Sequence, residues 1–309
     1  MPVRVRPSAG LKKKFLIRRI DLKPRNDHEV VLFLHIPKAG ATTLYKILGR
    51  NYSRAETLTL RGEQSQIARF KALPDAKRGQ YRLIQGHWHF GLHRFIPRPS
   101  TYITFLRRPI ERVLSFFGYA RTTPDHYLYP LLTTDRLDLR TLLAREMTVE
   151  LRNHQTRLLA GDEWKDPQRV VTGAALDQAK AHLRTHFRMV GLLEEFDASL
   201  LLLSRAFGWD LPLYVKENVT RKKPDETSLD AGTRKLVENA NSLDMELYEY
   251  ARSLFQEQRR AAGDAFDSEL SYFRRLNCTY ERLGKFHAHS LARVVSWFPM
   301  ATGKKLHPV

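Results

Sequence analysis

An unbroken apolar run that ends in a short glycine turn constrains the fold of this chain more than any other feature. Residues 29–36, EVVLFLHI, have the continuous apolar character of a strand buried on both faces. The turn PKAGATT follows at once, and then a segment with Leu44, Ile47 and Leu48 at helical spacing. This order predicts a strand, a phosphate-type loop and a helix, with the loop at the edge where open α/β sheets bind ligands.

Later segments repeat the alternation of strand and helix. Three of them read as strands, the last running into a helix: 81–87, 101–106 and 187–196. Pro109 stands where a first helical turn tolerates proline, residues 130–160 are mostly helical in character, and residues 241–261 form a strongly amphipathic pattern. Strands that alternate with helices predict an α/β fold with a mainly parallel central sheet.

Composition limits the partners and the compartment. The 309 residues are 42% hydrophobic and carry a formal net charge of +19, which favours polyanionic partners such as nucleic acid, anionic lipid, an acidic glycan or a phosphate-rich small molecule. The lone cysteine, Cys278, excludes a disulfide scaffold and a cysteine-rich zinc site. The most apolar run, Leu200 to Leu203, is far too short to span a membrane, so neither a secreted nor a membrane-threaded protein is expected.

Charge also divides the chain. We expect a basic N-terminal arm over residues 1–27, a folded domain over residues 28–285 and a basic C-terminal tail over residues 286–309. The arm is either a solvated tail or a segment that docks on an anionic surface such as a membrane.

The turn after the first strand carries the first chemical signal. Gly40 lets the backbone approach an anion closely, and the amides of residues 40–43 open the next helix and point at that anion. Thr42 and Thr43 add hydroxyl donors, and Lys38 adds a mobile cation, so the turn predicts phosphate or sulfate binding. It is not a Walker A loop, because Lys38 precedes the glycine, and an ordinary ATPase or kinase is therefore disfavoured.

The strand at 101–106 carries the second signal. Arg107 ends this strand and Ser115 lies in the helix that follows, so a guanidinium and a hydroxyl could hold a second phosphate. Arg108 and Arg112 are expected to be surface charges, with Glu111 as a partner.

A histidine-rich segment, QGHWHF, carries the third. His87 follows the second predicted strand, at the same edge as Lys38 and Arg107 if the sheet is parallel, and could act as a general base on an acceptor hydroxyl. His89 could assist or replace it, and His93 follows closely. No cysteine or carboxylate accompanies these histidines, so we expect no metal site.

Together these motifs resemble those of carbohydrate sulfotransferases. FLHIPKAGATTL resembles their 5′-phosphosulfate-binding motif, and YITFLRRPIERVLSFF resembles their 3′-phosphate-binding motif. The order, the spacing and the intervening GH are most similar to the heparan-sulfate and uronyl 2-O-sulfotransferase branch and its bacterial relatives, over roughly residues 29–255. Two further segments also resemble those bacterial relatives: NHQTRLLAG at 153–161, and NVTRKKP at 218–224, which is similar to a loop that covers the adenine nucleotide.

The resemblance implies a P-loop-like three-layer domain and a role for each matching residue. His87 would be the catalytic base, and Lys38 would stabilise the departing phosphate. The residues that would hold the cofactor fall into the 5′-phosphosulfate loop, the 3′-phosphate pair and the covering loop: Lys38, Gly40, Ala41, Thr42 and Thr43; Arg107 and Ser115; Thr220, Arg221, Lys222 and Lys223. One departure is the stretch Ala-Gly-Ala after Lys38, where the family has small polar residues.

The implied reaction moves a sulfuryl group from 3′-phosphoadenosine-5′-phosphosulfate (PAPS) to a hydroxyl of a saccharide or glycolipid acceptor, without a metal. A bacterial, cytoplasmic enzyme is implied, because the membrane anchor and extra cysteines of the eukaryotic members have no counterpart here. Two other classes stay open from the residues alone. A P-loop-type nucleotide kinase would explain the first motif but not Arg107 and Ser115. A nucleic-acid-binding protein would explain the charge, although no recognised binding motif is present.

Overall fold

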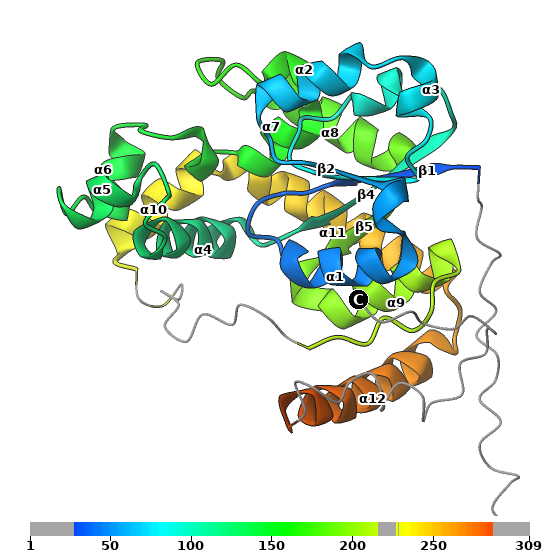
Figure 1. Cartoon of the computed structure of the whole chain (residues 1–309). Helices are drawn as coiled ribbons and strands as arrows, with labels where there is room; N and C mark the ends of the chain where they lie inside the picture. Colours follow the sequence, from blue (N-terminus) through cyan, green and yellow to red (C-terminus); the bar gives the residue numbers. More distant parts are fainter. Residues whose placement is uncertain (1–27, 216–226, 228, 287–309) are drawn as a thin grey trace, which may run out of the picture.

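The computed structural model of the chain describes residues 28–215, 227 and 229–286. A five-stranded parallel sheet lies at the centre, in the order β2-β3-β1-β4-β5 (Figure 1). Its strands are β1 (Val30–Leu34), β2 (Thr57–Leu60), β3 (Leu83–Gly86), β4 (Ser100–Leu106) and β5 (Phe187–Leu192). The predicted parallel α/β sheet is thereby confirmed. The arm at 1–27, most of the loop at 216–228 and residues 287–309 of the predicted tail lie outside the described residues.

β1 occupies the middle of the sheet because it is apolar on both faces. All five of its residues are buried, and it pairs with β3 on one side and β4 on the other. The register sets Leu34 opposite Gly86, so the residues that follow β1 and β3 emerge side by side. β4 continues beyond β1, and its end lies next to the loop that β1 feeds.

Helices cover both faces of the sheet and form the three predicted layers (Figure 1). On one face lie α1 (Ala41–Asn51) and α9 (Phe196–Phe207). On the other lie α2 (Gln64–Ala72), α3 (Asp75–Arg78), α7 (His154–Ala160) and α8 (Gly173–His186). α11 (Ser242–Ala261) packs against β5, α7 and α8, and α12 (Phe266–Phe286) packs against α9. Helix α12 thus runs one residue past the predicted domain limit at 285.

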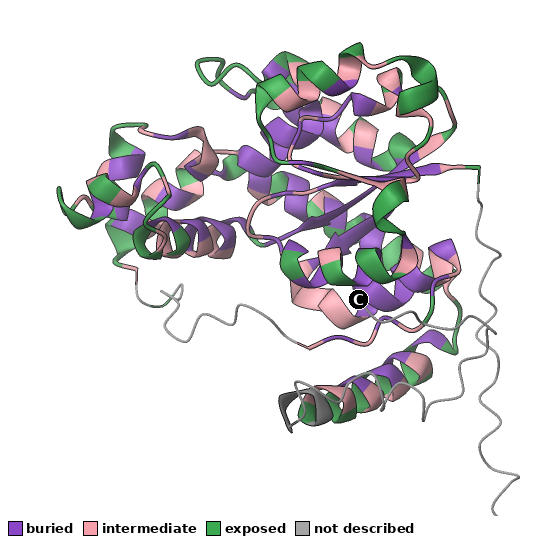
Figure 2. Ribbon diagram, in the orientation of Figure 1, coloured by how far each residue is buried: buried purple, intermediate pink, exposed green. Residues whose placement is uncertain are grey.

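A second group of helices forms a lobe on the side to which the carboxyl ends of the strands point (Figure 1). It contains α4 (Pro109–Thr122), α5 (Tyr129–Thr133), α6 (Leu139–Ala144) and α10 (Ala231–Ala240). Their leucines, valines and phenylalanines form an apolar cluster separate from the core around the sheet. Figure 2 shows buried residues through most of the sheet and on the inward sides of the helices of both parts. The ligand-binding edge of the sheet therefore faces a second packed body.

Two expectations were incomplete or wrong. The sequence analysis missed β2, whose residues TLTL are only partly buried, because an edge strand lacks a long apolar run. Arg112 is not a surface charge: its side chain is fully buried and donates from Nη2 to the Glu150 carbonyl at 2.6 Å. Arg108, by contrast, is exposed, and its Nη1 lies 3.6 Å from the Glu111 carboxylate, as expected.

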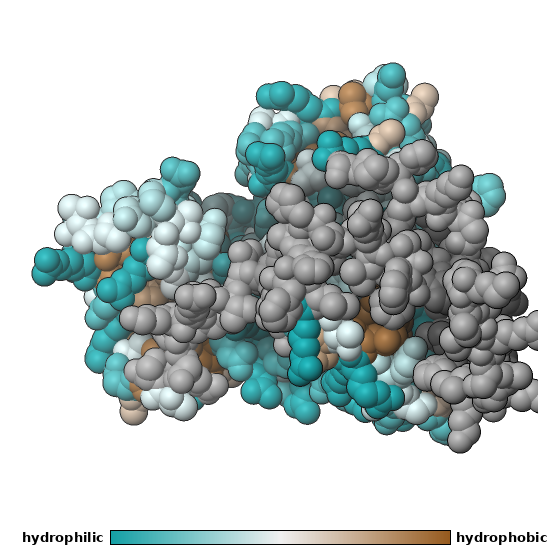
Figure 3. Space-filling view, turned by 60° about the horizontal axis from the view of Figure 1, so that its bottom comes forward, coloured by the Kyte–Doolittle hydropathy of each residue, from teal (hydrophilic) through white to brown (hydrophobic). Residues whose placement is uncertain are grey.

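Within the described ranges, no helix combines the length and the apolar character needed to cross a membrane. Seen from below, the described surface is mostly hydrophilic, with small hydrophobic areas between charged side chains (Figure 3).

Candidate functional site

The loop between β1 and α1 is shaped by two residues in the left-handed region. Lys38 has φ 70° and Gly40 has φ 86°, and α1 begins at Ala41, directly after them. A Cβ at position 40 would lie 2.5 Å from Cδ1 of Leu193, so glycine is needed both for its conformation and for its close packing. The loop therefore delivers the first backbone amides of α1, which have no intrahelical partner, to the carboxyl edge of the sheet.

The predicted loop residues differ in exposure. Thr42 is exposed, whereas Ala41 and Thr43 are buried, so Thr43 faces the protein. The Lys38 ammonium lies 4.0 Å from the centre of the Tyr119 ring in α4. A cation–π contact at a partly open site is worth about 0.5–1 kcal/mol.

Arg107 lies next to this loop, as predicted. Its Nη1 donates to the Lys38 carbonyl at 3.2 Å, which joins the end of β4 to the loop after β1. Its Nε has no hydrogen-bond partner among the described residues and lies 3.8 Å from the Glu111 carboxylate. Burial lowers the pKa of Arg107, while Glu111 and Glu194 oppose the shift. A buried guanidinium with an unused donor is suited to a second anionic group.

The backbone of Arg107 is held by a side chain that the sequence analysis did not single out. Gln155 accepts from the Arg107 N–H at 3.1 Å and donates from Nε2 to the Arg107 carbonyl at 2.9 Å. Gln155 has no exposed surface. Both ends of its amide are therefore used to fix the peptide that carries Arg107.

Gln155 is itself fixed, because α7 and α11 cap each other. Asp244 of α11 accepts from the backbone N–H groups of Gln155 and Thr156, at 3.1 and 2.7 Å. In return, the side-chain oxygen of Asn153 accepts from the N–H groups of Leu243 and Asp244, at 3.0 and 3.1 Å. These bonds satisfy amides that a helix start leaves open. The resembling segment 153–161 thus has a structural role beside the site.

The residue after Arg107 is held by a third element. The carboxylate of Glu194, in the short 3₁₀ turn Leu193–Glu195, accepts from the Arg108 N–H at 2.8 Å and from the Tyr248 hydroxyl at 2.6 Å. Leu193 of the same turn packs under Gly40. One turn after β5 therefore touches both strand ends.

His87 lies at this edge, on the other side of β1 from Arg107. Its N–H donates to the Leu60 carbonyl at 2.9 Å, and its Nδ1 lies 3.2 Å from the His35 carbonyl oxygen. A carbonyl only accepts, so Nδ1 carries the proton and Nε2 keeps the lone pair. Gly86 permits this close crossing, since a Cβ there would lie 1.8 Å from the Leu60 carbonyl oxygen. Burial lowers the pKa of His87, and the His35 carbonyl opposes the shift in part.

The other two histidines of the segment have different surroundings. Burial lowers the pKa of His89 to about 4, with Asp162 opposing the shift and Arg157 reinforcing it. His93 contacts the Tyr102 hydroxyl at 3.1 Å and the His186 ring at 4.8 Å between ring centres. His87, His89 and His93 therefore do not converge on one point.

Ser115 lies in the second turn of α4 and is half-buried. No hydrogen bond from its side chain to another described residue is present, so its assignment to a 3′-phosphate stays a prediction. The four residues assigned to a covering loop, Thr220, Arg221, Lys222 and Lys223, lie outside the described part of the chain.

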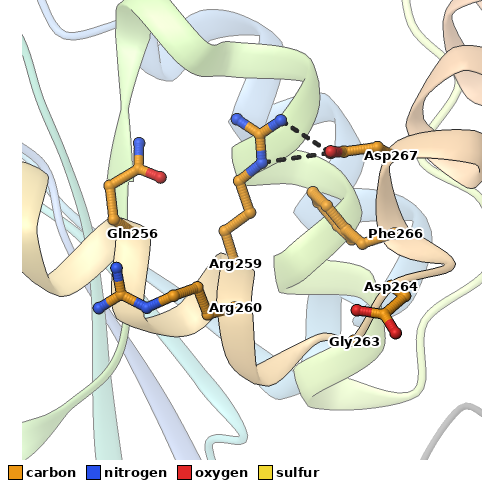
Figure 4. A pocket seen from close by; sticks show the side chains of 7 residues that line it. All are labelled: Gln256, Arg259, Arg260, Gly263, Asp264, Phe266 and Asp267. Atoms are coloured by element: carbon orange, nitrogen blue, oxygen red, sulfur yellow. Dashed lines mark hydrogen bonds and ion pairs between the residues drawn. The ribbon is translucent and has the colours of Figure 1, made fainter.

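Two cavities border α11. The larger, of ≈ 480 Å³, lies beside Arg108 and includes Ile110, Leu192, Glu194 and Tyr248 in its lining. It is separated from His87 by the width of β1 and β4, so it is not where that histidine would act. The smaller, of ≈ 360 Å³, lies between the end of α11 and the start of α12, where Arg259 and Asp267 form an ion pair (Figure 4). It includes no residue from a strand end.

The sequence analysis missed three contributors to this edge: His35, Gln155 and Glu194. His35 could have been found by the argument that selected His87, since it too ends a buried strand. Gln155 and Glu194 act on residues 48 and 86 positions away, and a single sequence does not indicate such contacts.

The fold and the site define an α/β protein with a P-loop-like glycine turn after the central strand, a buried arginine at the neighbouring strand end and a histidine across the central strand. The chain belongs to the galactose-3-O-sulfotransferase family, whose model matches residues 7–285. This confirms the resemblance to carbohydrate sulfotransferases.

The individual relatives are named as carbohydrate sulfotransferases of two kinds. Human galactose-3-O-sulfotransferase 3 is 26% identical over 262 residues, covering 78% of this chain and 60% of the relative. Heparan-sulfate 6-O-sulfotransferase 2 of Gallus gallus is 26% identical over 303 residues, covering 82% of this chain and 73% of the relative. The chain thus spans about 60% of the length of the galactose-3-O-sulfotransferases that it matches. The mouse sulfotransferase SULT7A1 complexed with PAP shares 16% identity over 69% of this chain and 64% of that one, with a TM-score of 0.36.

Proposed function

We propose that this protein is a sulfotransferase that moves a sulfuryl group from PAPS to a hydroxyl of a saccharide. The observation that carries the proposal is the meeting of three features at one sheet edge: the loop at Gly40, the buried guanidinium of Arg107 and the neutral ring of His87. Family membership supports the reaction class, and the names of the relatives support a carbohydrate acceptor. The residues fit PAPS, because its two phosphate positions require two separate anion-binding elements.

In the proposed reaction, the acceptor oxygen forms a bond to sulfur while the bond from sulfur to the phosphate oxygen breaks. Nε2 of His87 accepts the proton that the hydroxyl loses. The amides at the start of α1 donate to the 5′-phosphosulfate. Lys38 moves from Tyr119 to the departing phosphate oxygen as negative charge grows on that oxygen. Arg107 binds the 3′-phosphate with Ser115. Catalysis is mainly positioning and charge stabilisation, as in phosphoryl transfer.

Finer assignments extend this proposal. The names of the relatives favour a galactose-containing or heparan-type acceptor. The 2-O-sulfotransferase branch, a bacterial origin, a cytoplasmic location and peripheral contact with an anionic membrane stay predictions. Thr220, Arg221, Lys222 and Lys223 are proposed to cover the nucleotide.

A binding experiment tests the cofactor. Adenosine 3′,5′-bisphosphate should raise the melting temperature far more than AMP or ATP at equal concentration, because a ligand stabilises only the state that binds it. Equal shifts with adenosine 3′,5′-bisphosphate and AMP would contradict the two-site assignment. A larger shift with ATP and magnesium would favour a kinase.

A kinetic experiment tests the base. With saturating PAPS and a galactose- or heparan-type oligosaccharide, His87→Ala should lower kcat by about 10²–10⁴-fold and leave the affinity for adenosine 3′,5′-bisphosphate nearly intact. His89→Ala is the matched control and should cost less, since its ring faces Asp162 and Arg157. Wild-type turnover in His87→Ala, at an unchanged melting temperature, would remove His87 from the mechanism.

A further inference from the structure

His87 lies against a second imidazole. The rings of His35 and His87 have their centres 4.2 Å apart, at an interplanar angle of 35°. The His35 carbonyl also lies 3.2 Å from Nδ1 of His87. One residue therefore contacts both the protonated nitrogen of the proposed base and one face of its ring.

His35 is in turn held by helix α1. Its Nδ1 lies 2.9 Å from the Tyr45 hydroxyl, and the two rings meet edge to face at 5.3 Å and 86°. Phe33 contacts both rings, at 5.7 Å from His35 and 5.5 Å from Tyr45. Burial raises the pKa of Tyr45, so its hydroxyl keeps a proton to donate to Nδ1 of His35. The histidine therefore has a fixed rotamer before any substrate binds.

We propose that His35 is a positioning residue for His87 and that Tyr45 locks His35 in that role. The inference rests on the proposed function, in which Nε2 of His87 accepts the proton of the acceptor. The carbonyl of His35 determines which nitrogen of His87 is free, and the ring of His35 determines where that nitrogen points. Rotation of His87 would require the His35 ring to move, which costs its bond to Tyr45.

The charges around the pair suit this role. Burial, the neighbouring His87 and Lys38 together hold the pKa of His35 well below its ordinary value. A proton on His87 therefore disfavours a proton on His35. Burial also holds the pKa of His154 in α7 well below the ordinary value, and the charges of Arg112, His89, Arg157 and His87 add to that shift. Among the described residues, no acidic side chain contributes to the pKa shift of His87.

A proton titration of His87 tests the proposal without sulfate transfer. In protein labelled with ¹³C at the histidine rings, the resonance lost in His87→Gln identifies His87, and its midpoint should lie below 6.5 in the unaltered chain. His35→Ala opens one face of the ring to water and should raise that midpoint toward 6.5. His35→Phe keeps a ring there and should leave the midpoint low.

Turnover gives the second readout. Tyr45→Phe should lower kcat by about tenfold, and His35→Ala by about 10²-fold, because displacement of a reacting group by about 1 Å costs that much. The affinity for adenosine 3′,5′-bisphosphate should stay near the wild-type value in both variants. The trio of His93, Tyr102 and His186 offers a matched control, with a tyrosine–histidine contact of 3.1 Å and histidine rings 4.8 Å apart. His93→Ala and Tyr102→Phe should leave the His87 midpoint unchanged.

An unchanged His87 midpoint in His35→Ala, or wild-type kcat in Tyr45→Phe, would overturn the proposal. So would an equal change of the midpoint in His93→Ala. If the midpoint moves in His35→Ala while no variant, the parent included, transfers sulfate, the coupling of the two histidines stands and the proposed function fails.

Discussion

The ends of β1 and β4 are joined by the hydrogen bond from Arg107 to the Lys38 carbonyl. Different parts of the chain nevertheless fix their conformations. At β1 the turn is made by the loop itself, through the positive φ angles of Lys38 and Gly40. At β4 the peptide of Arg107 is held by Gln155, and that of Arg108 by Glu194. The turn after β5 touches both ends, but the conformation of the first is made by its own residues, whereas the second also depends on the packing of α7 and α11. Substitutions in α7 or α11 should therefore weaken 3′-phosphate binding more than they weaken binding at the loop after β1.

The largest effect is expected where two buried bonds are lost at once. Gln155→Met keeps the volume but leaves the N–H and the carbonyl of Arg107 without partners, at about 1–3 kcal/mol each. We expect the free energy of unfolding, measured with urea, to fall by about 2–6 kcal/mol. Among folded molecules, the preference for adenosine 3′,5′-bisphosphate over AMP should shrink, with AMP affinity nearly unchanged.

Gln256→Met, an exposed change on α11, is the control and should alter stability by no more than about 0.5 kcal/mol. If AMP and the bisphosphate lost affinity equally in Gln155→Met, the two strand ends would not be independent, and the comparison would fail.

The next largest effect is expected at one side chain of the second strand end, Arg107. Arg107→Ala should remove about 1.5–3 kcal/mol of 3′-phosphate binding, the value of a charge-assisted hydrogen bond, or roughly 10- to 150-fold in the bisphosphate-to-AMP affinity ratio. Calorimetric titration of both nucleotides gives that ratio. Arg108→Ala is the matched control, because its side chain is 60% exposed and it should leave the ratio in place. A similar loss in both variants would indicate only a general effect of positive charge.

Substitutions at two glycines, Gly40 and Gly49, test the loop at the end of β1. Gly40→Ala forces a side chain into a left-handed conformation at about 1–2 kcal/mol, and its Cβ would meet Leu193 at 2.5 Å. Both nucleotides should lose affinity, because both use the loop. Gly49→Ala, in the helix that follows Gly40 and with open space around its Cβ position, should raise the free energy of unfolding by about 0.5–1 kcal/mol. Unchanged AMP affinity in Gly40→Ala would show that the loop does not bind the 5′ group.

The smallest effect on binding is expected at Lys38. Its ammonium rests on Tyr119 in the free protein and is most useful when negative charge develops. Lys38→Ala should weaken nucleotide binding by less than about 1 kcal/mol while lowering kcat by more than that change accounts for. Steady-state kinetics at saturating PAPS separate the two quantities. Loss of affinity with normal turnover at saturation would make Lys38 only a binding residue.

The same contrast explains what the sequence could predict. The strands β1, β3, β4 and β5, the loop at Gly40 and the edge shared by Lys38, Arg107 and His87 follow from short-range patterns: apolar runs, a turn glycine and parallel connection. The burial of Arg112 did not follow, because the Glu150 carbonyl that accepts from it lies 38 positions away. Gln155 looked like an ordinary helical residue for the same reason. The conformation of a turn therefore follows from neighbouring residues, whereas the side chains and carbonyls that hold a strand end come from residues distant in the sequence.

The exchange of caps between α7 and α11 sets a condition on biosynthesis. Asp244 lies 89 residues after Gln155, and at about 5–20 residues per second the ribosome needs roughly 4–18 s to add that stretch. Until then, the start of α7 lacks its acceptor, and the peptide of Arg107 lacks a fully anchored glutamine. The nascent chain can close its anion loop early, but the neighbouring strand end matures only when the penultimate long helix has been made. A pause in translation between the codons for these two residues would therefore prolong the life of a nascent protein in which only one of the two strand ends is assembled.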